Sequence, residues 1–291
     1  MDERAALALV GADLPAAGDD CAVVDELVVT TDMLHETTDF PTGTTRYTAG
    51  WRAVGASLSD VAAMGAEATC AVAVYGAPTF EQEELTAFID GAKDVCALVD
   101  AEYVGGDLDH HAEFTTATTA VGRSAAPVLR SGAREGDAVC VTGTLGRSGA
   151  ALALFPDDAE RANALFRFEP RVAAGRALSD SATAMMDSSD GLARSLHQLA
   201  EASECGFAVE SDPLPVDATV EAVAESAAER RELAVHFGED FELVFTVPEA
   251  ELAAAREACP TPFTRIGTVS ESGVTMDGEP LPDRGYTHAG G

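Results

Sequence analysis

Apolar and polar positions follow two different periods along the first half of the chain, and each period predicts a different kind of element. Over residues 46–64 the apolar side chains recur at steps of four, three, four and three, which is one face of a helix. A second helix is predicted over 80–99, where an acidic first turn suits the helix dipole. Short runs of β-branched and small apolar residues predict strands over 26–32, 68–75, 102–104 and 113–122.

The second half repeats this alternation after a segment rich in Ser, Pro and Gly, residues 123–135. Strands are predicted over 138–142, 184–187, 241–247 and 264–269, and helices over about 147–155, 170–181, 191–202 and 249–258. Strands and helices mixed in this way in both halves predict an α+β protein of two domains, each a sheet covered by helices. We expect the domains to span residues 1–123 and 124–291.

Composition restricts the partners that the chain can have. With 291 residues, 46% of them hydrophobic, it can bury two ordinary cores. Its 50 acidic residues against 18 basic ones give a net charge of −32, which excludes unaided binding to nucleic acid or anionic membranes. The acidic residues are spread through periodic sequence, so we interpret them as a surface adapted to a high-salt cytoplasm, where screening weakens repulsion. An acidic mesophilic protein is the alternative.

The sequence also predicts where the protein resides. No run approaches 18 uninterrupted apolar residues, so no membrane span is expected. The first four residues lack the basic start of a secretory signal. The six cysteines are widely separated and none has the spacing of a zinc ligand, which favours buried free thiols in a reducing compartment. We therefore expect a soluble cytoplasmic protein.

Five acidic motifs stand out by position, because they follow turns, end predicted strands or lie at predicted helices. They are Gly18-Asp19-Asp20, Thr30-Thr31-Asp32, Leu58-Ser59-Asp60, Gly105-Gly106-Asp107 and Asp187-Ser188-Ser189-Asp190. Strand ends and helix starts are common ligand positions in α/β arrangements. Carboxylates that converge resist ionisation unless cations lie between them, and Mg²⁺ combines carboxylates with substrate phosphates. Simpler interpretations make Asp190 a helix N-cap and Asp19 and Asp20 turn residues.

The chain has a single lysine, Lys93, in the middle of a predicted helix. This excludes a Walker A loop and a protein-kinase site, since both need a lysine in a defined motif. The glycine-rich turn 143–149 either seats an anion at a helix start or is only a tight turn. Phosphate charge must then be met by metal, by backbone N–H groups and by arginines such as Arg130 or Arg147.

Two further features leave their alternatives open. His35 follows the Thr-Thr-Asp motif and is either a base or an incidental loop residue. Glu239 and Asp240 precede an apolar run, and the pair either binds a cationic substrate or faces water.

Taken in order, these motifs resemble the thiamine-monophosphate kinase family, in the superfamily of aminoimidazole ribonucleotide synthetase and selenophosphate synthetase. The matching segments are 18–24, 30–32, 58–66, 105–107, 130–133, 136–137, 141–146, 187–192 and 238–243. The resemblance implies an aminoimidazole ribonucleotide synthetase-like fold and an ATP- and Mg²⁺-dependent transfer of phosphate to thiamine monophosphate, giving thiamine diphosphate. It also implies a homodimer that associates through the N-terminal sheets.

The resemblance further implies roles for individual residues. Magnesium would be held by Asp20, Thr30, Thr31, Asp32, Asp60, Asp107, Asp187 and Asp190, ATP by Gly106, Asp107, Arg130 and Ser189, and the substrate by Asp39, Glu239 and Tyr286. An acidic group and an aromatic ring suit the flat cationic rings of thiamine. Two positions depart from the family pattern: Asp39 replaces a usual His, and Phe237 replaces a usual Gly.

Two alternatives remain at the level of sequence. The first is another ATP-dependent synthetase of the superfamily, although nothing before Gly18 supplies the reactive Cys of selenophosphate synthetase, and the chain ends in Gly291 rather than in the Cys of the hydrogenase-maturation relative. The second is a non-catalytic nucleotide- or metal-binding module. Formation of ADP that depends on thiamine monophosphate separates the kinase from both.

The distribution of charge generates a first prediction. Molar KCl should raise the midpoint of thermal unfolding markedly above its value in dilute buffer, because salt screens repulsion among the acidic surface residues. Calorimetry across a KCl series measures this midpoint. A flat response would contradict the high-salt interpretation.

Overall fold

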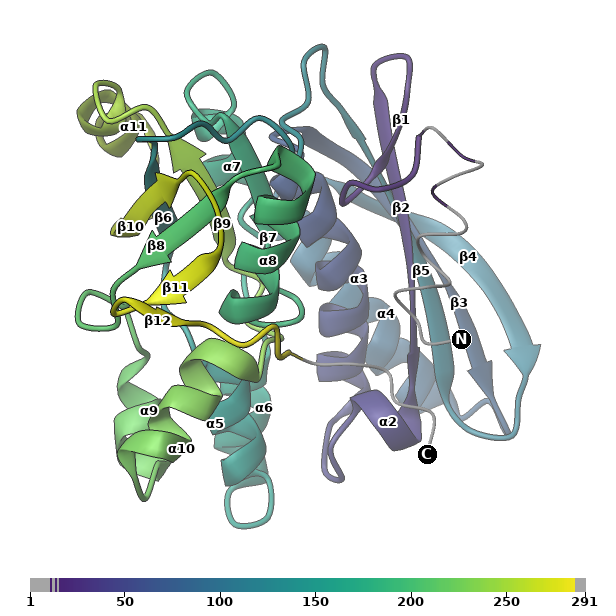
Figure 1. Cartoon of the computed structure of the whole chain (residues 1–291). Helices are drawn as coiled ribbons and strands as arrows, with labels where there is room; N and C mark the ends of the chain where they lie inside the picture. The colour runs from purple at the N-terminus through teal and green to yellow at the C-terminus, as the bar shows by residue number, and fades with distance from the viewer. Residues whose placement is uncertain (1–10, 12–13, 15, 286–291) are drawn as a thin grey trace.

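The computed structural model describes Gly11, Leu14 and residues 16–285, and its strands form two sheets, one in each half of the chain (Figure 1). The first sheet has the order β1 (Ala22–Val24), β2 (Leu27–His35), β5 (Thr115–Arg123), β3 (Glu67–Ala77) and β4 (Glu102–His110). β3 and β4 run parallel, and the other neighbours run antiparallel. Its helices are α2 (Glu36–Asp39), α3 (Arg46–Ala63) and α4 (Gln82–Leu98).

The second sheet has the order β12 (Glu279–Pro280), β11 (Val274–Met276), β8 (Gly206–Val209), β10 (Phe263–Ser270), β6 (Ala138–Thr142), β9 (Leu243–Val247) and β7 (Ala184–Asp187). The helices of this half are α5 (Arg147–Leu154), α6 (Ala159–Phe166), α7 (Val172–Leu178), α8 (Leu192–Ser203), α9 (Ala218–Val223), α10 (Ala227–Arg231), the π-helix η1 (Glu232–His236) and α11 (Leu252–Ala258). The predicted α+β fold with two helix-covered sheets is confirmed.

Helix α3 is the element that both halves share. It begins at Thr45, whose side chain accepts a hydrogen bond from the backbone N–H of Thr48. One side packs on the first sheet and the other on α7 and β7 of the second half (Figure 1), so most of its residues are buried. The apolar period predicted a single buried face, because a periodic pattern cannot show that a second domain covers the opposite side.

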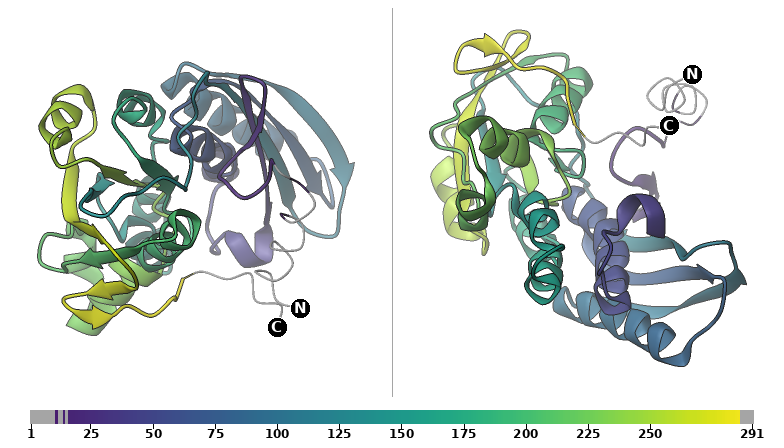
Figure 2. Two further views of the ribbon diagram at one scale, coloured as in Figure 1. Left: turned by 45° about the horizontal axis from the view of Figure 1, so that its top comes forward. Right: turned by 90° about the horizontal axis from the view of Figure 1, so that it is seen from below.

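Helices α3 and α4 pack on the same face of the first sheet (Figure 2), and they touch backbone to backbone. A Cβ atom on Gly50 would lie 2.1 Å from the carbonyl oxygen of Phe88, and one on Gly91 would lie 2.0 Å from that of Tyr47. These two glycines therefore permit a helix crossing that any side chain would prevent.

Among the described residues, no helix covers the other face of the first sheet, and we call it the open face. Met33 on β2 and Val72 and Val74 on β3 lie on it with side chains 54%, 36% and 40% exposed. Exposed apolar residues on one face of a sheet in an otherwise acidic protein indicate a surface that becomes covered. In the part of the chain that the structure describes, no helix is both long and apolar enough to cross a bilayer.

Two predicted strand ends are wrong, and both affect candidate residues. β2 continues to His35 and β4 to His110, so Asp32 and Asp107 lie within strands rather than at their ends. β4 is rich in Gly and Asp, which are poor strand formers, and its pairing with β3 overrides this local preference. The elements missed altogether are short ones that depend on tertiary contacts: β1, α2, α6, β8, α9, α10, η1, β11 and β12.

The helix crossing generates a second prediction. Replacing Gly50 by Ala should lower the free energy of unfolding by about 1–3 kcal/mol, since the new methyl group must displace backbone. Urea unfolding measures the change, and Thr86→Ala on the solvent side of α4 serves as a control that should stay within about 0.5 kcal/mol of the wild type. Equal unfolding midpoints for Gly50→Ala and the wild type would contradict the close crossing.

Candidate functional site

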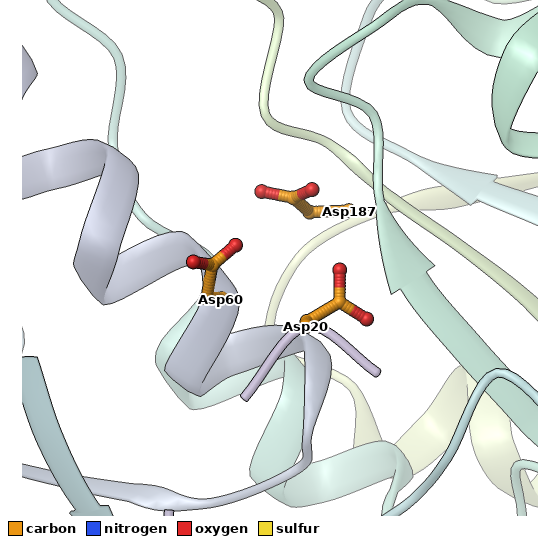
Figure 3. A group of neighbouring side chains, drawn as sticks. All are labelled: Asp20, Asp60 and Asp187. Carbon is orange, nitrogen blue, oxygen red and sulfur yellow. The ribbon is translucent and has the colours of Figure 1, made fainter. Parts of the chain in front are cut away.

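Three carboxylates from distant parts of the sequence meet at the boundary between the two halves. Asp20 precedes β1, Asp60 lies late in α3, and Asp187 ends β7. One oxygen of each lies within 4.8 Å of the others, and the three side chains point toward a common centre (Figure 3). Carboxylate oxygens at this spacing fit a hard divalent cation such as Mg²⁺. We call these residues the aspartate cluster.

Hydroxyl groups orient two members of the aspartate cluster. Thr30 Oγ1 donates to Asp60 Oδ2 at 2.6 Å, and Ser59 Oγ donates to Asp187 Oδ2 at 2.6 Å. Thr30 lies on β2 and Ser59 on α3, so each hydroxyl links a different pair of elements. These bonds fix the carboxylates before any ion binds.

Arg130 fixes the third carboxylate. Its guanidinium donates to both oxygens of Asp20, at 3.0 and 3.2 Å, and its backbone N–H donates to Asp19 Oδ1 at 2.6 Å. Burial lowers the pKa of Arg130, but the attraction of Asp20 and the other nearby carboxylates outweighs it and raises the pKa above the ordinary value. Asp19 and Asp20 are therefore more than plain turn residues.

The aspartate cluster opposes its own ionisation. Burial, and then repulsion by Asp32 and Asp187, raises the pKa of Asp60 well above its usual range. Burial, and then repulsion by Asp20, raises the pKa of Asp187 to about 8. A divalent cation among these oxygens would restore the ionised form, because opposite charge lowers a carboxyl pKa.

Strand β2 divides the Thr30-Thr31-Asp32 motif between its two faces. Asp32 faces α3 and accepts a hydrogen bond from Ser57 Oγ at 2.6 Å, on the same side as Thr30. Burial raises the pKa of Asp32, with a further increase from nearby Glu239. The side chain of Thr31 is exposed on the open face and donates to the backbone oxygen of Thr118 at 2.8 Å, so the structure does not bring it to the aspartate cluster.

The Gly106-Asp107 pair also lies away from the aspartate cluster. In the register of β3 with β4, Asp107 pairs with Val74 and shares the open face with it. Two strands separate β4 from β2, which is about 14 Å at ordinary strand spacing. Within a single chain, Asp107 and Asp32 therefore do not meet.

The loop from Asp187 to Asp190 contacts the segment that contains Glu239. The backbone N–H of Glu239 donates to the oxygen of Ser189 at 2.6 Å, and that of Ser188 donates to the oxygen of Glu242 at 2.8 Å. The interpretation of Asp190 as an N-cap is wrong, because α8 is capped by Gly191 with φ 101°. Asp190 is half-buried beside the cap.

The glycine-rich turn 143–149 does not offer its helix start to an external anion. The N–H groups of Gly146 and Ser148 at the beginning of α5 donate to the Asp240 carboxylate, at 2.6 and 3.0 Å. Asp240 is thus the anion of this helix start, and it does not face water. Burial raises the pKa of Asp240 to about 7, against the effect of the two hydrogen bonds.

A pocket of about 640 Å³ lies between the two halves and holds two of the expected substrate residues, Asp39 and Glu239. We call it the interdomain pocket; its wall includes Phe40, Arg46, Leu152, Phe166 and Phe237. Asp39 Oδ2 accepts hydrogen bonds from the backbone N–H of His35 and from Thr38 Oγ1, both at 2.7 Å. The third expected residue, Tyr286, lies outside the described residues.

His35 itself does not line the interdomain pocket. Its Nδ1 lies 3.1 Å from Thr115 Oγ1, in a contact between neighbouring strands. Its role as a base stays a prediction without support from this geometry.

Sequence reasoning gave no role to three polar residues of α3: Arg52, Ser57 and Ser59, although Ser59 stands in the Leu58-Ser59-Asp60 motif. All three are buried, and each donates to an acidic residue of the site, Glu239, Asp32 and Asp187 respectively. The available signal was that these polar side chains stand in a helix made mostly of small and apolar residues. Burying a polar group there without a hydrogen-bond partner would be costly.

The electrostatics of the aspartate cluster generate a third prediction. Metal-free folded protein keeps a proton on Asp187 up to about pH 8, whereas the unfolded chain releases it near pH 4. Stability therefore falls as pH rises between these values, since the unfolded state binds fewer protons. In EDTA, Asp187→Asn should raise the free energy of unfolding more at pH 8 than at pH 5.5.

Urea unfolding with and without Mg²⁺ measures this effect. Mg²⁺ should stabilise the wild type at pH 8 and should stabilise Asp187→Asn less. Asp180→Asn, which removes an exposed charge from the same half, is the matched control. If both variants changed stability equally at pH 8, self-repulsion within the aspartate cluster would be disproved.

Known proteins match the chain along nearly its whole length. The family models described as AIR synthase related protein, N-terminal domain and C-terminal domain, match residues 18–124 and 134–277. Thiamine-monophosphate kinase of Halobacterium salinarum is 62% identical over 291 residues, covering 99% of this chain and 100% of the relative. The enzyme of that name from Methanospirillum hungatei JF-1 is 41% identical over 302 residues, with 99% of each chain covered.

A solved structure agrees in fold as well as in sequence. AaThiL complexed with AMPPCP and TMP has a TM-score of 0.89 to this structure and 30% identity, covering 99% of this chain and 97% of that chain. The domain matches, the full-length relatives and the shared architecture together show that the chain belongs to the thiamine-monophosphate kinase family of AIR synthase related proteins.

Proposed function

We propose that the chain transfers the γ-phosphoryl group of ATP to thiamine monophosphate, giving thiamine diphosphate and ADP. The observation that carries this proposal is the aspartate cluster beside an acidic and aromatic pocket, in a chain related to thiamine-monophosphate kinases. A solved relative holds AMPPCP and TMP together, which agrees with the use of both substrates at one site. Free cysteines in the described residues agree with a cytoplasmic location.

Asp20, Asp60 and Asp187 are the proposed core of the magnesium site, with Asp32 and Asp190 beside it. Their oxygens provide the hard ligands, and the hydroxyl and guanidinium donors around them fix the geometry in advance. Bound Mg²⁺ supplies positive charge for the phosphate oxygens of the reacting groups. With one lysine in the sequence, the protein depends on such ions and on Arg130 for this charge.

The interdomain pocket is the proposed site for thiamine monophosphate. The half-buried ring of Phe237 is available to the flat thiamine rings, and Asp39 and Glu239 offer negative charge to its cationic ring. Glu239 also lies close enough to Asp32 to raise its pKa, so the pocket adjoins the side of β2 that leads to the aspartate cluster. The phosphate of the substrate would then point toward the metal site. Tyr286 stays a proposed substrate contact.

A second cavity, of about 380 Å³, suits the nucleotide. Gly106 and Asp107 line it together with apolar and aromatic side chains, among them Tyr75, Phe88 and Tyr103. Leu85 and Phe88 of α4 form one wall, so the cavity lies on the helix side of β4, and its apolar lining fits a nucleobase better than a phosphate. Arg130 lies at the aspartate cluster instead, where it would meet the phosphates of ATP, and Ser189 follows Asp187 by two residues in the loop that contacts Glu239.

A homodimer through the N-terminal sheets would explain why Thr31 and Asp107 lie apart from the aspartate cluster of their own chain. Thiamine monophosphate and the aspartate cluster lie on the helix side of β2, whereas Thr31 and Asp107 lie on the open face. A second copy packed on that face would cover Met33, Val72 and Val74 and would bring its own Asp107 toward Thr31. Each active site would then use residues of both copies, with the domain division near residues 123 and 124 in each.

The test of the proposed function is product formation. With ATP, Mg²⁺ and thiamine monophosphate, the wild type should form ADP and thiamine diphosphate in equal amounts, and neither should form when thiamine monophosphate or Mg²⁺ is left out. ADP formed equally well without thiamine monophosphate would point to another synthetase of the superfamily. No ADP under any of these conditions would point to a binding module.

The split of acidic residues between two copies generates a fourth prediction. Asp107→Asn and Asp60→Asn should each lower turnover at least about a hundredfold while the protein stays folded. The reason is that the magnesium ions, which would neutralise charge in the transition state, would lose a ligand. Asp109→Asn, two residues along the same strand, is the matched control and should retain activity. Mixed, refolded Asp107→Asn and Asp60→Asn chains should regain part of the activity in heterodimers, and no recovery despite proven heterodimers would place Asp107 in its own chain's site.

A further inference from the structure

We propose that Arg52 is a positioning residue of the interdomain pocket, which holds Glu239 in the geometry that thiamine monophosphate requires. The inference rests on the proposed function, because it concerns the substrate of that site. Arg52 belongs to α3 of the first half and Glu239 to the second half, so the contact sets the pocket wall across the domain boundary.

The surroundings of Arg52 leave it few other positions. Its side chain is only 3% exposed, and its guanidinium carbon lies 3.5 Å from the centre of the Phe166 ring. The ring centres of Phe168 and Phe241 lie 5.3 and 5.5 Å from the same guanidinium carbon. Aromatic rings that enclose a guanidinium on several sides fix its plane, and with it the directions of its N–H donors.

Both terminal nitrogens of the guanidinium donate to groups of the second half. One terminal nitrogen donates to the backbone oxygen of Phe166 at 2.5 Å and to Ser148 Oγ at 3.3 Å. The other donates to Glu239 Oε2 at 2.5 Å and lies 3.5 Å from the Glu239 backbone oxygen. Arg52 thus contacts both the side chain and the main chain of Glu239.

Glu239 needs such support because its backbone is strained. Its φ is +62° and that of Phe241 is +55°, in the left-handed region that non-glycine residues rarely adopt. Ser148 Oγ donates to the Glu239 backbone oxygen at 2.6 Å, and the Phe241 ring stacks on Phe168 at 4.2 Å. The loop is therefore held from the second half as well, and Arg52 adds the contact that comes from the first.

This arrangement has a consequence for binding. Glu239 is 26% exposed in the pocket, so its carboxylate is available to substrate while Arg52 holds Oε2. Loss of the guanidinium would free the side chain to turn and would leave the strained loop without its contact to α3. The interdomain pocket would then lose the fixed position of one of its two negative groups, whereas the nucleotide cavity beside β4 would not change.

The experiment compares Arg52→Lys, Arg52→Met, Glu239→Gln and the double variant Arg52→Met/Glu239→Gln with the wild type. KM for thiamine monophosphate, KM for ATP and kcat are measured for each, together with the Kd of thiamine monophosphate by calorimetry and the unfolding midpoint. Arg176→Met is the matched control, since Arg176 forms another ion pair between the halves, with Glu67 at 3.2 Å, but on the surface.

Arg52→Met should raise KM and Kd for thiamine monophosphate by about tenfold or more, with KM for ATP within about twofold of the wild type. Arg52→Lys should give KM and Kd values for thiamine monophosphate between those of the wild type and Arg52→Met. Its ammonium keeps the charge but cannot reach all the acceptors at once. In the Glu239→Gln background, Arg52→Met should cause little further increase in KM or Kd for thiamine monophosphate, because the two residues act as a unit. Arg176→Met should leave all kinetic constants unchanged.

The inference is overturned if the Arg52 variants fold and KM for thiamine monophosphate does not rise. It is also overturned if KM for ATP rises as much as KM for thiamine monophosphate. Effects of Arg52→Met and Glu239→Gln that multiply independently would also overturn it. Should Arg52→Met not fold, the comparison of Arg52→Lys with Arg52→Lys/Glu239→Gln decides the question in the same way. A wild type without turnover that depends on thiamine monophosphate would instead overturn the proposed function.

Discussion

The structure depends on the burial of one helix, α3, between two domains. A helix buried on most of its sides must satisfy every polar side chain that it carries, because an unpaired polar group in such a place is costly. Arg52, Ser57 and Ser59 find their partners in Glu239, Asp32 and Asp187. The same contacts that allow α3 to be buried therefore place the acidic residues of the site. Stability and chemistry share one set of hydrogen bonds.

That arrangement has a cost, which is concentrated negative charge. The three carboxylates of the aspartate cluster are brought within 4.8 Å in a protein whose net charge is already −32. Repulsion and burial raise the pKa values of Asp60 and Asp187, so the metal-free site favours protons over ionised carboxylates. A site of this kind gains much from divalent cations and from the phosphates that come with them, which agrees with the proposed phosphoryl transfer.

The order of the longer elements, the α+β fold with two domains and the family could be predicted from the sequence, because apolar periods and short motifs are local signals. It also indicated Asp20, Asp60 and Asp187 as members of one site. It could not show which face of a strand a residue occupies, so Thr31 and Asp107 were grouped with residues from which the sheet separates them. Nor could it show that Asp240 fills the helix start at Gly146, since that contact joins segments 94 residues apart.

The central claim is that the aspartate cluster holds the metal ions for transfer of phosphate to thiamine monophosphate. Anomalous diffraction from crystals grown with Mn²⁺, a non-hydrolysable ATP analogue and thiamine monophosphate tests it most directly. The account predicts anomalous peaks in contact with Asp20, Asp60 and Asp187, between these carboxylates and the nucleotide phosphates. A ternary complex with both substrates bound and no anomalous peak at these carboxylates would contradict it.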